Sequence, residues 1–155
     1  METPFLTNDG RQDVLSKLEF LRTVKRAEVA HYLHEAKESG DVIDNAAYED
    51  AKNEQARLEG RILELEQLLA TAKLINEVRT DVVSLGSVVH LSSSDGREYR
   101  YSIVGAYEAQ PSAGRISNES PVGRALLGHK VGDKVMVSTP GGVKEYAILS
   151  ISQLQ

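Results

Sequence analysis

The chain has 155 residues, of which 41% are hydrophobic, so it can form one ordinary domain or two small ones and is not of disordered composition. It has no cysteine, which excludes disulfides, thiol nucleophiles and cysteine metal sites, and its formal net charge of -5 argues against nucleic-acid binding through a simple basic patch. We find neither a run of about 18 apolar residues nor a secretory signal pattern, and we therefore expect no membrane association and a cytoplasmic location.

Residues 1–78 are predicted to form a helical hairpin. Residues 13–38 contain no glycine or proline, and Gly40 can end this first helix. At about 1.5 Å per residue this arm would be roughly 39 Å long. A second helix is expected from about residue 45 to residue 76, and the short break between the two favours antiparallel packing around a coiled-coil seam of Leu58, Ile62, Leu65, Leu69 and Ala72.

Residues 79–155 change in character and are predicted to form a small antiparallel sheet with one helix packed on it. Ser120 is a plausible N-cap with Pro121 at the first helical position, and Gly128 could end that short helix. The chain as a whole is therefore assigned to the α+β class with two domains. Apolar and β-branched runs predict strands at Ser87–Ser93, Glu98–Gly105, Lys134–Thr139 and Lys144–Ile151.

The predicted tip of the hairpin, about residues 39–46, carries Asp41 and Asp44. Acids and Asn45 before a helix are ordinary capping residues, because they accept hydrogen bonds from free N–H groups. Alternatively, both carboxylates point outward and bind a hard cation such as Mg²⁺, which would need a partner to complete the site. Residue type alone leaves both interpretations open.

Other candidate chemistry is sparse. Lys37 and Lys52 flank the tip and could be solvated lysines or contacts to a phosphate backbone. His31 and His34 could share a helix face but lack the pattern of a zinc site. Glycine-rich phosphate loops and a nucleophile elbow are absent from the sequence. A rod with an acidic tip joined to a β-rich module favours an interaction protein over a self-contained enzyme.

Two long segments resemble the Gre family of bacterial transcript-cleavage factors, and its GreA type in particular. The first, "AKESGDVIDNAAYEDAKNEQ", aligns with the family's hairpin-tip motif. The second, "SNESPVGRALLGHKVGDKVMVSTPGG", is similar to the family's Ser-Pro segment and its Thr-Pro-Gly-Gly turn. The resemblance covers nearly the whole chain in the right order. It implies a coiled-coil hairpin and an FKBP-like C-terminal domain.

The resemblance also implies a function. Gre factors bind bacterial RNA polymerase through the C-terminal domain and insert the coiled coil into the secondary channel, where the tip acids help to hold Mg²⁺. The polymerase then cuts backtracked RNA, so the factor itself is not an enzyme. On this resemblance Asp41 and Asp44 would hold the shared Mg²⁺, while Asn45 and Tyr48 shape the tip.

The remaining roles follow from the same resemblance. Lys37 and Lys52 would contact the RNA 3′ segment or the channel wall, and Ser120 and Pro121 would dock on polymerase. We expect a monomer, because a rod that enters a channel cannot remain paired.

Asp44 departs from the family's pattern, which usually has glutamate at that position. A Gre-related inhibitor that occupies the same channel, with little or no cleavage stimulation, is therefore the alternative function. Prolyl isomerisation is a third possibility suggested only by the implied fold, and the few aromatics of the C-terminal half make a sparse lining for a proline pocket (Tyr99, Tyr101, Tyr107 and Tyr146).

Overall fold

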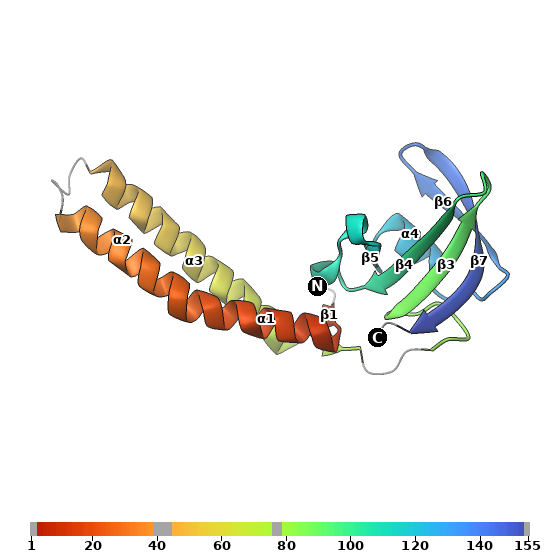
Figure 1. Cartoon of the computed structure of the whole chain (residues 1–155), viewed down its shortest axis with the longest axis horizontal. Helices are drawn as coiled ribbons and strands as arrows, with labels where there is room; N and C mark the ends of the chain where they lie inside the picture. The colour runs from red at the N-terminus through yellow and green to blue at the C-terminus, as the bar shows by residue number, and fades with distance from the viewer. Residues whose placement is uncertain (1–2, 39–44, 76–78, 154–155) are drawn as a thin grey trace. The chain divides into compact units, whose positions relative to one another are not determined.

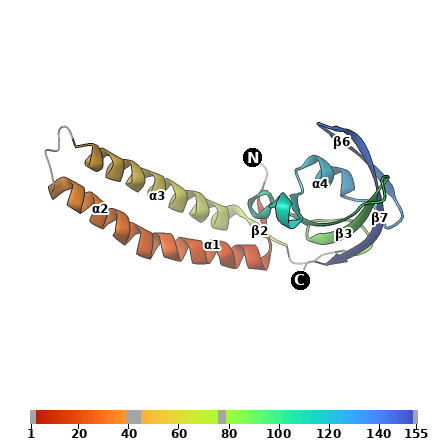
Figure 2. The same cartoon turned by 45° about the horizontal axis from the view of Figure 1, so that its top comes forward.

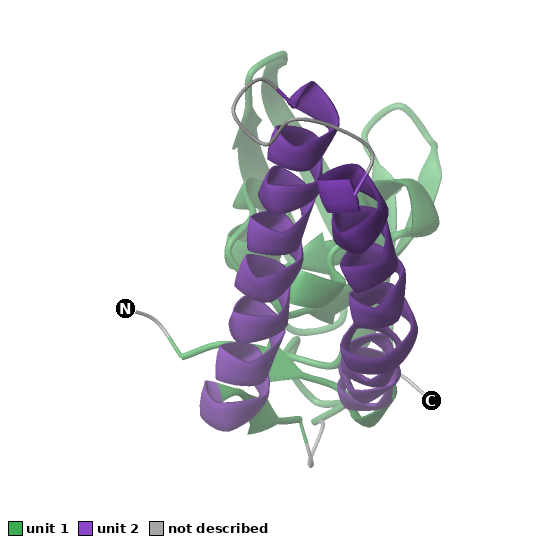
Figure 3. Cartoon of the chain, turned by 90° about the vertical axis from the view of Figure 1, so that its left-hand side faces the viewer, with its two compact units in different colours: residues 1–10, 72–155 green, residues 11–71 purple. Residues whose placement is uncertain are grey.

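The computed structural model describes residues 3–38, 45–75 and 79–153 (Figure 1). The chain divides into two compact units, which Figure 3 shows in different colours. One unit is residues 11–71, and the other combines residues 1–10 with residues 72–155. The first ten residues therefore group with the β-rich part of the chain. Within the described residues, no helix is long and apolar enough to cross a bilayer.

The first arm of the hairpin is nearly continuous helix. It consists of α1 (Asn8–Phe20), a π-helical turn η1 (Leu21–Lys25) and α2 (Arg26–Glu38). In the π turn the N–H of Arg26 donates to the carbonyl of Leu21, five residues earlier. Thr23 Oγ1 donates to the Glu19 carbonyl at 2.6 Å, a side-chain bond that competes with the regular helical pattern. The predicted single helix thus contains one wider turn.

The second arm, α3 (Ala46–Thr71), runs beside α2, as Figures 1 and 2 show. The expected helix to residue 76 is too long. Residues 73–74 form the short strand β2 (Lys73–Leu74), which pairs in parallel with β1 (Phe5–Leu6). Lys73 N–H donates to the Pro4 carbonyl at 2.9 Å, so extended backbone replaces the last predicted turn.

Apolar side chains from both arms fill the centre of the hairpin. Of the predicted coiled-coil seam, Leu58, Ile62 and Leu65 are buried, whereas Leu69 is half-buried and Ala72 lies beyond the end of α3. The buried side chains become smaller toward the end where α2 and α3 meet, from leucine and isoleucine to alanine. The buried members are Val14, Leu18, Val29, Ala36, Ala51, Leu58, Ile62 and Leu65.

The β-rich unit is built on a five-stranded sheet of order β5-β4-β3-β7-β6. All neighbouring pairs are antiparallel except β4 and β5, which are parallel. The sheet curls around the short helix α4, and the two-domain α+β class is confirmed (Figures 1 and 2). The strands and helix are β3 (Ser87–Ser93), β4 (Glu98–Val104), β5 (Arg115–Ser117), α4 (Pro121–Leu126), β6 (Lys134–Thr139) and β7 (Gly142–Gln153).

One face of this sheet packs on α4 and forms the core of the unit. Leu91, Ile103 and Ile148 are almost fully buried there, together with Leu126 of α4. The alternating pattern that predicted the strands placed these residues on one side. The opposite face of β3, β4 and β7 is largely polar, with the side chains of His90, Arg100, Ser102, Ser150 and Ser152.

The start of α1 is fixed by a residue from far along the chain. Thr7 Oγ1 accepts a hydrogen bond from the Gly10 N–H at 3.0 Å, as an N-cap does. Glu108, which ends the 3-10 turn η3 (Ala106–Glu108), accepts from the Thr7 N–H at 2.8 Å and from the Thr7 hydroxyl at 2.5 Å. In an ordinary capping box the acid would sit at position 10. Here Gly10 leaves that space to Glu108.

Candidate functional site

The sequence places the candidate site at the end of the hairpin, between α2 and α3. Asp41 and Asp44 lie outside the described residues, so their predicted metal role remains a prediction. The structure does describe the residues on both sides of them: Lys37, Asn45, Tyr48 and Lys52.

Asn45 links the two arms. Its side-chain oxygen accepts a hydrogen bond from the Tyr48 N–H at 3.1 Å, so Asn45 is the N-cap of α3. Its side-chain amide donates to the carbonyl of Ala36 in the last turn of α2, at 2.5 Å. One side chain therefore satisfies a free N–H at the start of one helix and a carbonyl near the end of the other. The sequence did not predict this pair of hydrogen bonds. The role of Asn45 in shaping the tip remains a prediction.

Small side chains let the two helices approach each other at this end. Ala36 of α2 and Ala51 of α3 are 3% and 0% exposed. Because alanine fills little space, the hairpin holds no room here for an enclosed pocket. Among the described residues of this end, side chains can therefore be presented outward, but the two arms leave no space between them for a substrate.

The two flanking lysines differ in their surroundings. Lys52 Nζ lies 5.5 Å from the centre of the Tyr48 ring, a cation–π distance that holds the ammonium beside the aromatic face. Lys37, in the last turn of α2, is exposed. Both lysines are thus near the hairpin end, on opposite arms, as predicted. Their expected contact with RNA remains a prediction.

Ion pairs between the arms stiffen the hairpin below this end. Arg26 donates two hydrogen bonds of 2.8 Å to the carboxylate of Glu59, and Arg22 contacts Glu66 at 2.6 Å. The hydrogen bond from Arg26 lowers the pKa of Glu59, and the same bond raises the pKa of Arg26. Sequence reasoning missed these pairs, because spacing along one helix does not reveal which residues face each other across two.

The hairpin histidines form local pairs. His31 Nε2 lies 3.1 Å from Glu35, and His34 Nε2 lies 3.3 Å from Glu38, each one turn further along α2. In the described part of the chain, no three histidine, aspartate or glutamate side chains gather into a metal site.

Ser120 and Pro121 open α4 in the manner that the sequence predicted. Ser120 Oγ accepts from the Gly123 N–H at 3.1 Å and donates to the Ser117 carbonyl at 2.7 Å, while Pro121 is the first helical residue and is exposed. Gly128 has a φ of 84° and follows the end of this helix, as expected. Their predicted role in docking is a separate question that this local geometry leaves open.

Three of the four tyrosines in the β-rich unit form one cluster. The ring centroids of Tyr99 and Tyr101 lie 5.8 Å apart in a stacked arrangement. Those of Tyr99 and Tyr146 lie 5.9 Å apart, with the rings edge to face. Burial, followed by the neighbouring Tyr146 and Tyr99, raises the pKa of Tyr101. These rings pack on one another and on the core, so they serve chiefly as part of the hydrophobic interior.

A two-arm helical hairpin with a narrow end and a separately built β unit places this chain among two-domain α+β proteins with a coiled-coil arm. Family comparison gives the particular family. Residues 4–74 match the model "Transcription elongation factor, N-terminal", and residues 78–153 match "Transcription elongation factor, GreA/GreB, C-term". The chain belongs to the GreA/GreB family of transcription elongation factors.

Two sequence relatives support the assignment. The chain is 50% identical to transcription elongation factor GreA of Acetivibrio thermocellus over 94% of both chains. It is 48% identical to transcription elongation factor GreA of Thermoanaerobacter pseudethanolicus over 94% of this chain and 95% of that one. The crystal structure of GreA factor homolog 1 of Thermus thermophilus is 36% identical, covers 97% of this chain and 99% of its own, and has a TM-score of 0.45.

Proposed function

We propose that this elongation factor binds bacterial RNA polymerase, inserts its hairpin into the secondary channel and stimulates the polymerase's own Mg²⁺-dependent cleavage of backtracked RNA. The observation that supports it best is the match of both halves of the chain, in order, to the two GreA/GreB domain models. The narrow end of the hairpin adds physical support, because its described residues can present side chains inside a partner but leave no space between the two arms for a substrate.

In this proposal Asp41 and Asp44 supply carboxylate oxygens to a Mg²⁺ ion held jointly with polymerase. Carboxylates are the ligands that this hard cation prefers, and Mg²⁺ usually takes only one or two from a protein. When bound, the metal supplies charge stabilisation and an activated water for phosphodiester hydrolysis. The two acids alone leave most of the coordination shell open, so the factor by itself should cut nothing.

The described residues have supporting roles. Asn45 ties the two arms together directly before α3. Tyr48 holds the Lys52 ammonium beside its ring, where Lys52 and Lys37 can contact the RNA 3′ segment or the channel wall. Ser120 and Pro121 belong to the face of the β-rich unit that docks on polymerase, and the factor acts as a monomer.

Stalled, backtracked polymerase complexes test the proposal. Adding the factor with Mg²⁺ should release short 3′ RNA fragments, and the Asp41→Ala variant should lose this effect while still binding polymerase. The Asn53→Ala variant, which removes an exposed side chain of α3 outside the proposed site, should behave as wild type. If the wild-type factor releases no fragments across a wide concentration range, the proposal fails.

The inhibitor alternative makes the opposite prediction on complexes that are not backtracked, where it would slow nucleotide addition. Asp44 is one methylene shorter than the glutamate usual in the family, and a misplacement of about 1 Å can cost on the order of 10²-fold in rate. We therefore expect Asp44→Glu to increase fragment release. An unchanged cleavage rate in this variant would show that residue 44 does not tune activity.

A further inference from the structure

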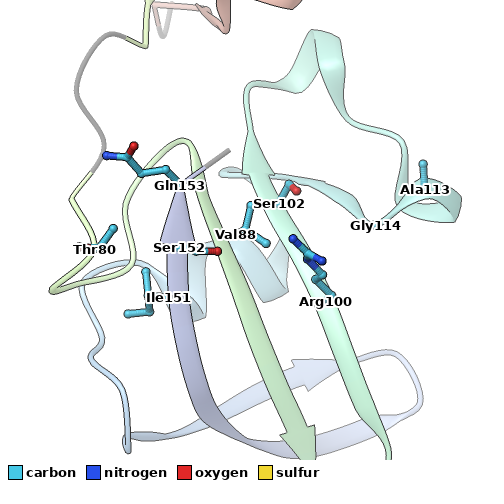
Figure 4. Close-up of a pocket in the computed structure, with 9 residues that line it drawn as sticks. All are labelled: Thr80, Val88, Arg100, Ser102, Ala113, Gly114, Ile151, Ser152 and Gln153. Atoms are coloured by element: carbon cyan, nitrogen blue, oxygen red, sulfur yellow. The ribbon is translucent and has the colours of Figure 1, made fainter. Parts of the chain in front are cut away.

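The polar face of the β-rich sheet, opposite the face that packs on α4, contains a hollow of about 780 Å³. Figure 4 labels its lining residues. We propose that this hollow binds a small ligand carrying a diphosphate group, of which a nucleoside diphosphate is the fitting example. The proposal concerns the β-rich unit alone and does not depend on the proposed action on polymerase.

Three adjacent strands and two loop segments, one at Thr80 and one at Ala113 and Gly114, build the hollow. Arg100 and Ser102 come from β4, Val88 from β3 and Ser152 from β7, and Figure 4 shows them lining it together. Ser102 pairs with Val88 across the antiparallel ladder, and Val88 pairs with Ser152, so these three side chains share one face. None of the lining residues that the structure describes is acidic.

Arg115 adds a second guanidinium to this face. It pairs with Ser102 in the parallel ladder of β4 and β5, so its side chain projects on the same side. With strands about 4.8 Å apart and residues about 3.3 Å apart along a strand, the Cα atoms of Arg100 and Arg115 are on the order of 8 Å apart. Arginine side chains are long enough to reach one diphosphate from two such positions.

Both guanidinium groups are available. Six other arginines contact a carboxylate, whereas among the described residues neither Arg100 nor Arg115 has an acidic partner or a side-chain hydrogen bond. The nearest acid on this face, Glu98, lies 3.4 Å from His90. The hydroxyls of Ser102 and Ser152 are likewise without a described partner. Arg100, Ser102 and Ser152 therefore offer donors that line the hollow, and Arg115 lies on the same face of the sheet beside it.

The loop wall of the hollow is fixed by close backbone contact. Gly114 has a φ of 76°, and a Cβ atom there would lie 2.8 Å from the carbonyl oxygen of Arg100. The Ser102 N–H donates to the Gly114 carbonyl at 2.7 Å. Glycine thus lets the loop lie against β4 beside Arg100, so the wall is already in place before any ligand binds.

Charge, size and chemistry together point to a diphosphate. The guanidinium fork matches phosphate oxygens in a bidentate manner. The hollow is in the size range of small-molecule sites and larger than a single phosphate requires. Val88 adds an apolar side chain to it, which suits a sugar or a base. The loop at Ala113 and Gly114 bounds it on one side, which fits a small ligand better than a nucleic-acid strand.

Titration of the full chain with pyrophosphate and with adenosine diphosphate, without Mg²⁺ and at fixed ionic strength, tests the proposal. Calorimetry should give a dissociation constant on the order of 1 mM or tighter, and amide NMR shifts should gather at Ser102, Gly114 and Ser152. Arg100→Gln and Arg115→Gln should each weaken binding by about tenfold or more. The matched control is Arg124→Gln, which removes the same charge from α4 on the other side of the sheet.

Equal affinity for pyrophosphate and adenosine diphosphate would show that the site recognises the diphosphate group alone. Tighter binding of adenosine diphosphate would show that the site recognises a nucleotide. Either result supports the proposal. The proposal is overturned if neither ligand binds, or if Arg124→Gln weakens binding as much as Arg100→Gln does. It is also overturned if a single-stranded oligonucleotide binds in preference to both and is lost in the same variants. The thermal midpoint of each variant confirms that it is folded.

Discussion

Asn45 shows how one side chain can fix the end of a helical hairpin. We predict that Asn45→Ala lowers the free energy of unfolding by about 1–2 kcal/mol, because the N-cap of α3 and the hydrogen bond from Asn45 to the Ala36 carbonyl are both lost. Asn45→Asp should recover the cap but not the bond to Ala36, and should fall between the two. Urea unfolding followed by circular dichroism measures the difference.

The control for this prediction is Asn53→Ala, which changes the same residue type in the interior of α3. Alanine is the better helix former, so this variant should be neutral or slightly stabilised. Equal stability of wild type and Asn45→Ala would contradict the linking role.

Glu108 and Gly10 form the second residue-scale device, a capping box whose acid comes from the distant turn η3. We predict that Gly10→Ala alone is destabilising, because its Cβ would lie 2.3 Å from the Glu108 carboxyl carbon. Glu108→Ala should cost about 1–3 kcal/mol by leaving the Thr7 N–H without its partner. The double variant Gly10→Glu, Glu108→Ala restores an acid at the ordinary position of the box and should be more stable than Glu108→Ala.

Thermal unfolding of wild type, Gly10→Glu, Glu108→Ala and the double variant measures this coupling, and Glu119→Ala, on the same unit, is the control for removing one surface acid. Additive effects of the two substitutions would show that Glu108 does not occupy the place of the missing side chain. This capping box could not be predicted from the sequence for a physical reason. Glycine at position 10 is typical of a helix break, and the acid that completes the box lies about a hundred residues away.

At the scale of elements, the hairpin should lose stability in acid through one identifiable pair. The Arg26 hydrogen bond lowers the pKa of Glu59 from its usual value of 4.5. The pair therefore stabilises the folded hairpin above that value, and the contribution is lost as the pH falls through the lower, folded-state pKa. Glu59→Gln should reduce stability at neutral pH and match wild type in strong acid.

Urea unfolding at a series of pH values checks this prediction. Both groups are exposed, so the difference should be modest and should shrink at high salt. Glu19→Gln, on the other arm, has no described side-chain partner and should leave the pH profile unchanged. A profile that Glu59→Gln leaves unaltered would contradict the role of the pair.

Helices and strands whose apolar residues recur with a clear period could be predicted from the sequence, and those without such a period could not. Alternating apolar residues located β3 and β6 at their observed bounds, and helical spacing located both arms. Strand β5 has three residues and β1 and β2 have two each, too few to show a period. The π turn at Leu21–Lys25 was missed because widening one turn changes a hydrogen-bond pattern without changing residue type.

The candidate site likewise has some features that could be predicted from the sequence and others that could not. Residue types and the family motif indicated which side chains gather near the hairpin end, and the described ones do lie there. The bond from Asn45 to Ala36 and the pairing of Arg26 with Glu59 could not be predicted, because they depend on how two helices align side by side. The hollow beside Arg100 was also missed, since its residues come from three strands and two loop segments.

At the scale of the whole molecule, the proposed function assigns chemistry to the hairpin end and docking to α4, and this division is testable. Pro121 is exposed at the first position of α4, where alanine is tolerated and Ser120 still caps the helix. We predict that Pro121→Ala weakens polymerase binding but leaves the cleavage rate at saturating factor unchanged. Asp41→Ala should do the reverse, with normal binding and no cleavage at any concentration.

Competition between the variants gives the decisive measurement. Asp41→Ala should occupy the docking site and suppress cleavage by the wild-type factor, whereas Asp41→Ala combined with Pro121→Ala should suppress it only at higher concentration. Interactions that act only on binding change the amount of factor required, and those that act only in the transition state change the maximal rate. If Pro121→Ala lowers the maximal rate while half-saturation stays the same, binding and cleavage are not divided between the two parts of the chain.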